Sequence, residues 1–184
     1  MSKTKKMVQL SLLVAVGIAL HVFEAMLPAL NVLPIPGAKL GLANIVTLLT
    51  LVFLGYREAL GVVLLRSLLA SLVAGTFLTT TFYLSFAGAL GSGLVMGLLY
   101  LFSRGRFSLV GISICGAVAH NVSQLLVAAL LIQQAGIFMY LPYLLLFALP
   151  TGYFTGLVVR YLLRYSSLGF NTVDKRASYN KSMN

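Results

Sequence analysis

Apolar residues fill six stretches of this chain almost without interruption, and polar or turn-forming residues separate them. The stretches cover, to within a few residues, 7–27, 40–54, 59–74, 82–102, 109–132 and 142–163. A helix needs about 20 apolar residues to cross the hydrocarbon core of a bilayer, because it rises about 1.5 Å per residue. We therefore predict an all-α integral membrane bundle of about six transmembrane helices over residues 1–165.

Two of these stretches are shorter than a full span, and one connection is unusual. Residues 40–54 and 59–74 fall short of about 20 residues, so we expect either that longer neighbours bury them or that the bilayer thins locally around them. The connection over residues 28–39 contains three prolines, which oppose a regular helix. Because irregular backbone is not stable against lipid, this loop is predicted to fold back onto the protein.

Charged residues are scarce and unevenly placed. Only 9% of the residues are charged, compared with about a quarter in soluble domains, which argues against water as the main solvent. The net charge of +10 comes from cations that flank the apolar stretches, a pattern typical of cytoplasmic loops and not of nucleic-acid binding. With the N-terminus inside the cell, the cytoplasmic cations are Lys3, Lys5, Lys6, Arg57, Arg104, Arg106, Arg160, Arg164, Lys175, Arg176 and Lys181.

The orientation in the membrane follows from this distribution, because the outer side would carry only Lys39. Both termini are therefore predicted to be cytoplasmic. We expect a multi-pass protein of the plasma membrane, surrounded by the lipid bilayer and without a nucleic-acid partner. Residues 166–184 are predicted to form a polar, disordered cytoplasmic tail.

Besides Arg160, which is counted above with the cytoplasmic cations, the apolar stretches contain four charged or histidine side chains. A charge in such a stretch needs a compensating partner or a function. His21 and Glu24 are three residues apart and therefore share one face of the first helix. Arg66 lies close to the middle of the third stretch, and we expect Glu24 or the polar residues around His120 to lie within its reach. Neutral residues would join helices at a lower cost in free energy than a buried arginine, so Arg66 is interpreted as functional.

Uncharged polar residues extend this candidate site. His120, Asn121 and Gln124 are predicted to share one face of the fifth helix, and Asn44 lies near the start of the second. An alternative interpretation for Asn44 and Gln124 is that they only join helices through buried hydrogen bonds. Lys39, at the outer mouth, would add a second cation for a small anionic ligand that enters from outside.

The sequence lacks the groups that most enzymes and metal sites require. Asp174 is the only aspartate, so neither an Asp-rich magnesium cluster nor a Ser-His-Asp triad can form in the membrane. No Walker-type phosphate loop is present, so the chain cannot drive transport with an ATPase of its own. Cys115 is the only cysteine, which excludes an intrachain disulfide. We therefore predict a protein that is not an enzyme and that has no metal or cofactor.

Small residues repeat at helical spacing in three places. Ala15 and Ala19 lie on a face of the first helix that is turned away from His21 and Glu24, which would let another helix approach closely. For two glycine pairs we predict ordinary packing inside the protein, namely Gly93 with Gly97 and Gly152 with Gly156.

Three features carry a resemblance to a known family: the stretch Pro36-Gly-Ala-Lys-Leu-Gly-Leu-Ala-Asn44, the turn near Gly55, and Arg66. Over residues 10–165 the chain resembles the heptaprenyl diphosphate synthase component I family, also called the Gx transporter family. The architecture is in turn similar to that of the substrate-binding S components of energy-coupling factor (ECF) transporters. Those proteins have six helices, cytoplasmic ends and an outer loop that covers the ligand.

The resemblance implies the substrate-capturing subunit of an ECF-type importer for a small anionic or isoprenoid-related molecule. Ala15 and Ala19 match the Ala-x-x-x-Ala pattern by which S components dock on a transmembrane coupling subunit, and residues 28–39 match the covering loop. The implied partners are a small-molecule substrate, that coupling subunit and two ATPase subunits. The family label also implies an alternative, a non-catalytic membrane subunit associated with a heptaprenyl diphosphate synthase. A third hypothesis is an autonomous ion-coupled carrier.

Overall fold

The computed structural model describes residues 3–26, 41–102 and 106–165, and these residues are almost entirely helical. They form six α-helices and one 3₁₀ helix: α1 (Lys3–Met26), α2 (Asn44–Phe53), α3 (Tyr56–Val73), α4 (Thr80–Phe102), α5 (Leu109–Ile132), η2 (Ala135–Tyr140) and α6 (Leu141–Tyr165). No strand occurs in these ranges, so the prediction of an all-α fold is confirmed. The connection that contains Lys39 and the tail over residues 166–184 lie outside the described residues.

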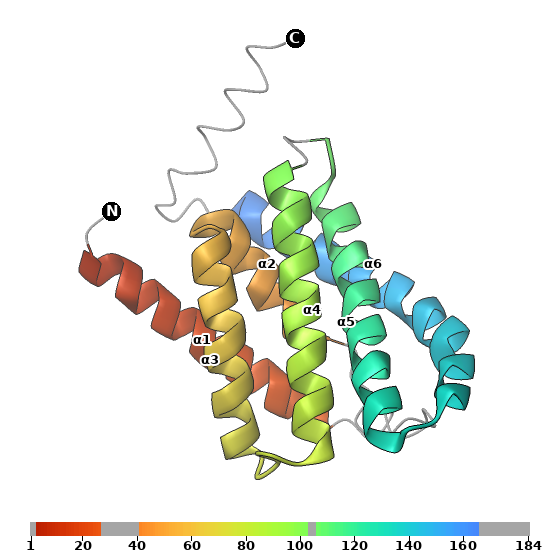
Figure 1. Ribbon diagram of the computed structural model, residues 1–184. Coiled ribbons are helices and arrows are strands. Elements are labelled where there is room, and N and C mark those ends of the chain that lie inside the picture. The colour runs from red at the N-terminus through yellow and green to blue at the C-terminus, as the bar shows by residue number, and fades with distance from the viewer. Residues whose placement is uncertain (1–2, 27–40, 103–105, 166–184) are drawn as a thin grey trace.

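The helices pack as a bundle around the shortest of them. Figure 1 shows α3, α4 and α5 standing side by side, with α1 crossing obliquely on one side and α6 packed against α5 on the other. Helix α2 contacts each of the other five α-helices, and seven of its ten residues are buried. At ten residues it is about 15 Å long, roughly half the thickness of the hydrocarbon core. The prediction that longer neighbours bury this stretch is confirmed.

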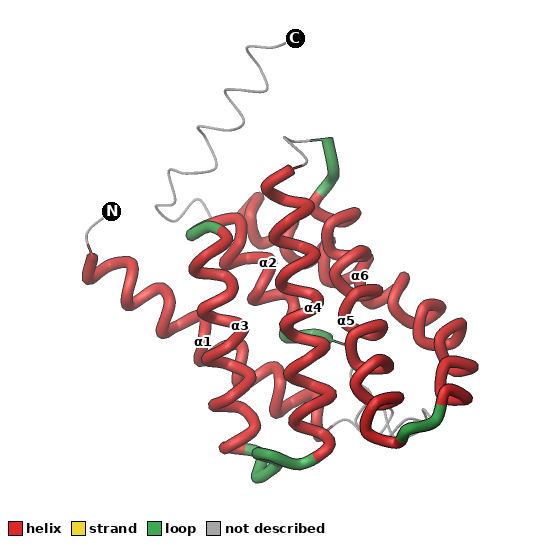
Figure 2. Tube along the Cα trace, in the orientation of Figure 1, coloured by secondary structure: helices red, strands yellow, loops and turns green. Residues whose placement is uncertain are grey.

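Two glycine turns set the limits of α2. Gly41 has φ +80°, and its carbonyl accepts a hydrogen bond from the backbone N–H of Asn44 at 2.8 Å. Gly55 has φ +106° and connects α2 to α3. Residues with a side chain rarely adopt these angles, which explains why glycine occupies both positions. Figure 2 shows the turn before α2 at mid-height of the bundle, whereas the other described turns lie at its ends.

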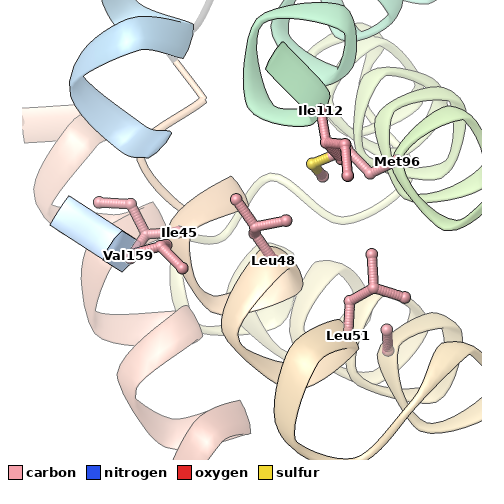
Figure 3. Close-up of a cluster of buried hydrophobic side chains, with 7 residues drawn as sticks. Ile45, Leu48, Leu51, Met96, Ile112 and Val159 are labelled. Carbon is pink, nitrogen blue, oxygen red and sulfur yellow. The ribbon is translucent and has the colours of Figure 1, made fainter. Parts of the chain in front are cut away.

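The apolar core surrounds α2. Ile45, Leu48 and Leu51 of α2 pack with Met96 of α4 and Ile112 of α5 (Figure 3). All of these side chains except Ile45 are at most 1% exposed. Because this core anchors α2 on several sides, it also fixes the polar first turn of α2 in the interior of the protein.

The outer surface of the bundle is suited to lipid. Leu12, Leu72, Phe102 and Leu130 are each more than half exposed, and such large apolar side chains favour a hydrocarbon environment. Four segments of the described chain are long and apolar enough to cross a membrane, namely Lys3–Glu24, Thr80–Phe102, Leu109–Ile132 and Ala135–Arg164. Of the two remaining helices, α2 is short as predicted, whereas α3 has 18 residues and exposes Leu65, Leu72 and Val73, so the prediction that longer neighbours bury it is wrong. The chain is therefore a membrane protein.

All described cations except the buried Arg66 lie near one end of the bundle. Helices α1, α3 and α5 begin at this end and α6 ends there (Figure 1). Lys6 of α1 forms an ion pair with Glu58 of α3 at the same end. These cations all belong to the set predicted to face the cytoplasm, so the fold brings the described members of that set together on one side.

Glycines allow direct contact between helix backbones. A methyl group added to Gly152 would lie 2.6 Å from Ile114 Cα, and one added to Gly156 would lie 2.6 Å from Val110 Cα. Helix α6 therefore touches the backbone of α5 at two successive turns. The glycine pair of α4 faces side chains of α3 in a similar way. The prediction that both glycine pairs serve packing inside the protein is confirmed.

Candidate functional site

Arg66 is the largest fully buried side chain of the described chain, at 2% exposure in the middle of α3. Its aliphatic part lies against Gly17 of α1, where an added methyl group would come to 3.0 Å from Arg66 Cδ. The glycine thus provides the space that the arginine side chain needs between the two helices. From there the guanidinium reaches α2.

The hydrogen bonds of this guanidinium are few and long. Arg66 Nη2 donates to Asn44 Oδ1 at 3.4 Å and to Thr47 Oγ1 at 3.3 Å, both on α2. Ser92 Oγ of α4 donates to the same Asn44 oxygen at 3.0 Å. Arg66 Nε has no hydrogen-bond partner among the described residues. Since a guanidinium carries five N–H donors, at least one donor is left for another acceptor.

The inward face of α1 brings a carboxylate to this region. Glu24 is 2% exposed and attracts Arg66 electrostatically. Glu24 Oε1 also accepts a hydrogen bond from the backbone N–H of Gly41 at 2.5 Å. His21 is buried as well, about one helical turn before Glu24. Glu24 therefore lies within electrostatic reach of Arg66 and also contacts the turn that begins α2.

The outward face of α1 remains open. Ala15 and Ala19 are both exposed. Ala15 borders a groove of about 490 Å³ between α1 and α3, together with Val14, Gly61 and Leu65. This open, small-residue face is compatible with the docking of another helix.

His120 and Gln124 form a second group, which faces α4. A methyl group added to Gly88 of α4 would lie 2.8 Å from His120 Cε1 and 2.8 Å from Gln124 Cγ. One added to Gly41 would lie 3.9 Å from His120 Cγ and 2.9 Å from Asn44 Nδ2. The turn at Gly41 therefore connects this group to the surroundings of Arg66. Gln124 Nε2 is buried without a hydrogen-bond partner in the part of the chain that the structure describes.

Asn121 points to another helix than His120 and Gln124 do, so the prediction that the three side chains share one face of α5 is wrong for Asn121. Its Nδ2 donates to the carbonyl oxygen of Leu144 in α6 at 2.8 Å. Consecutive residues of a helix point about 100° apart, so Asn121 turns to α6 while His120 turns to α4. We therefore assign Asn121 to the joining of α5 and α6 and not to the group around Arg66.

Several contacts of the site are not apparent from the sequence. Thr47 and Ser92 are unremarkable hydroxyl residues in apolar helices, although Thr47 shares a helix face with Asn44 at a spacing of three. Gly17 and Gly88 matter only because of the side chains that lie against them. Lys39, the second cation of the predicted site, lies outside the described residues.

The donors of this cluster favour a ligand that supplies hydrogen-bond acceptors. Arg66 Nε and Gln124 Nε2 are the buried nitrogen donors discussed above, and carboxylate or phosphate oxygens would satisfy them. Within residues 3–26, 41–102 and 106–165, no three His, Cys, Asp or Glu side chains are grouped so that they could hold a metal ion. The cluster is thus chemically suited to an anion.

A family model described as heptaprenyl diphosphate synthase component I matches residues 13–162, which include the residues around Arg66. No curated protein and no solved structure matches the chain. Because the family model covers most of its length, the chain belongs to the heptaprenyl diphosphate synthase component I family.

Proposed function

We propose that this chain is a membrane-embedded, non-catalytic subunit that binds a small anionic molecule near Arg66 and passes it to a partner protein. The observation that carries the proposal is the complete burial of Arg66 with an unused donor among apolar helices. A charge at this depth is costly, and neutral side chains would join helices equally well. An anionic ligand would supply an acceptor for the Arg66 donor that is left unused.

The neighbouring residues have distinct roles in this proposal. Asn44 and Thr47 orient the guanidinium from α2, and Glu24 balances its charge when no ligand is bound. His120 and Gln124 extend the binding surface toward α4 and α5. Lys39, which the sequence predicts as a second cation for the ligand, lies outside the described residues.

The first candidate partner is a heptaprenyl diphosphate synthase. The family description names component I of that synthase, which supports an association with a catalytic component. The chain itself has one aspartate, so it lacks the carboxylate clusters that could hold magnesium for such chemistry. In this case the bound anion would be an isoprenoid diphosphate or a precursor of one.

An ECF module is the second candidate partner. The exposed Ala15 and Ala19 on the outward face of α1 favour it, because small residues let a helix of a coupling subunit approach closely. In this case the chain would capture its ligand outside the plasma membrane, and two ATPase subunits would energise the import.

The binding proposal is tested by replacing Arg66 with methionine. Purified wild-type and Arg66→Met proteins are titrated with a short isoprenoid diphosphate and with inorganic diphosphate in a calorimeter. We expect the affinity to fall roughly ten- to hundredfold, since a hydrogen bond to a charged group contributes about 1.5–3 kcal/mol. Arg57→Met is the matched control, because Arg57 is an exposed cation on the same helix.

Thermal unfolding of the same variants separates binding from folding. Replacing a buried charge by an apolar side chain of similar length is often neutral or stabilising. We therefore expect Arg66→Met to unfold at the same temperature as the wild type or higher. A variant that binds the probes as tightly as the wild type, or that loses binding only because it unfolds, would contradict the proposal.

The two partners are distinguished by an Ala15→Leu, Ala19→Leu double variant. If α1 docks on a coupling subunit, co-purification of that subunit and ATP-dependent uptake should both be lost, while ligand affinity is unchanged. Val16→Leu, a change at another exposed position of α1, is the control. Unchanged uptake removes the docking assignment. Dependence of prenyl chain elongation on this chain would instead favour the synthase, and uptake without any ATPase would favour an autonomous carrier.

A further inference from the structure

A second groove, of about 460 Å³, lies between the start of α5 and the last part of α6. Its lining combines one cation, two hydroxyl-bearing side chains and three aliphatic side chains: Arg160, Ser108, Tyr153, Leu109, Val110 and Leu157. None of these residues contributes to the Arg66 site, so the groove requires a separate explanation.

The helix geometry orders three of these side chains along the groove. Tyr153, Leu157 and Arg160 are spaced by four and three residues, so they form one stripe along α6. Gly156, next to this stripe, brings the backbone of α6 against Val110 of α5. Because α6 ends where α5 begins (Figure 1), Arg160 lies nearer the end of the bundle. Tyr153 lies about 10 Å deeper along the helix.

The mouth of the groove offers positive charge and hydrogen-bond donors. Arg160 is exposed and makes no ion pair or hydrogen bond with any described residue. The two described carboxylates are elsewhere, with Glu58 paired to Lys6 and Glu24 buried near Arg66. Ser108 Oγ accepts a hydrogen bond from Gly111 N at 3.0 Å, which leaves its own proton available for another acceptor.

We propose that this groove binds one anionic phospholipid, with the phosphate at Arg160 and Ser108 and an acyl chain along Leu157 toward Tyr153. The mouth selects a negatively charged group, and basic pockets at helix ends attract anionic headgroups. Beyond the mouth the groove is lined by Leu157 and the ring of Tyr153, where an acyl chain would gain apolar contact and a soluble anion would not. A phospholipid combines both properties, and the bilayer supplies it at high local concentration.

The test uses the full chain in vesicles of phosphatidylcholine with or without phosphatidylglycerol, followed by native mass spectrometry of the lipids that stay bound. We expect the wild type to retain one phosphatidylglycerol molecule in preference to phosphatidylcholine. Arg160→Gln should reduce this retention roughly fivefold, the effect of one cation near a headgroup. Arg160→Lys should keep most of it, and Arg57→Gln, which removes another exposed cation, should have no effect.

Three outcomes would overturn the proposal. The groove has no preference for anionic lipid if the wild type retains both lipids equally. Arg160 has no specific role if Arg57→Gln and Arg160→Gln reduce retention to the same extent. The groove takes a soluble anion instead of a lipid if glycerol phosphate displaces phosphatidylglycerol at equal concentration. Melting temperatures of the variants verify that a loss of lipid is not a loss of fold.

Discussion

Helix α6 packs against α5 with the two backbones in contact, whereas α1 packs against α3 through side chains and leaves a groove. In the α5–α6 contact, methyl groups on Gly152 and Gly156 would come to 2.6 Å from backbone atoms of α5. In the α1–α3 contact, a methyl group on Gly61 would have no atom within 4 Å. Gly61 instead borders the groove of about 490 Å³.

The two contacts also differ in polarity. The α1–α3 contact contains Arg66 against Gly17 and the ion pair between Lys6 and Glu58. The α5–α6 contact is joined by close backbone packing and by a hydrogen bond from Asn121. Dispersion forces fall steeply with distance, so stability is concentrated where backbones touch. In this fold the α5–α6 contact therefore contributes mainly to stability, whereas the α1–α3 contact holds the arginine of the proposed binding site.

One added methyl group should change the stability of the protein very differently in the two contacts. The loss in the α5–α6 contact is the largest effect that we expect. Gly156→Ala should destabilise the protein by about 1–3 kcal/mol, because the new methyl group overlaps the backbone of α5. Gly61→Ala should change stability by less than about 0.5 kcal/mol, since its methyl group enters open space. Equilibrium unfolding in mixed detergent measures both values. Similar losses in the two variants would remove the distinction between the contacts.

A methyl group at Gly17 should have an intermediate effect, on binding more than on stability. It would come to 3.0 Å from Arg66 Cδ, so the flexible arginine must shift. Displacing a side chain from its preferred rotamer costs about 0.5–1.5 kcal/mol. We therefore expect Gly17→Ala to weaken anion binding roughly two- to tenfold in a calorimetric titration. In an Arg66→Met background the same change should have no further effect, and an additive loss would show that Gly17 acts independently of Arg66.

The ion pair between Lys6 and Glu58 should contribute least. Its side chains are 41% and 22% exposed, and surface ion pairs typically contribute about 0.2–1 kcal/mol. A double-mutant cycle with Lys6→Gln and Glu58→Gln should give a coupling energy of about 0.5 kcal/mol or less, decreasing with added salt. A coupling energy above about 2 kcal/mol, well outside that range, would mean that this pair contributes as much to stability as the α5–α6 packing.

The outline of the fold was predictable from the sequence because hydropathy is a local property. The six apolar stretches correspond to the six α-helices, and residues 40–54 were recognised as too short to span. Arg66 and Glu24 were also recognised, because a charge within an apolar stretch is conspicuous without knowledge of its neighbours. The sequence does not predict that α2 contacts all five other α-helices, because the order of residues within one short helix does not specify its neighbours.

The partners of the charged residues were harder to predict. Hydroxyl side chains in apolar helices often bond to their own backbone, as Thr50 does to Val46 and Ser67 does to Val63. The sequence therefore gave no reason to select Thr47 and Ser92 from among them. The direction of Asn121 depends on a carbonyl of α6, which lies far along the chain from it.

Residue type and order alone are enough to identify a helical membrane protein with a few ionisable groups inside it. The packing of the helices is needed to see that α2 stands at the centre, that Gly17 makes room for Arg66, and that α1 turns its small residues outward. These features depend on which helix faces are brought together. Burial of a charge with its hydrogen-bond partners is a property of several helices at once.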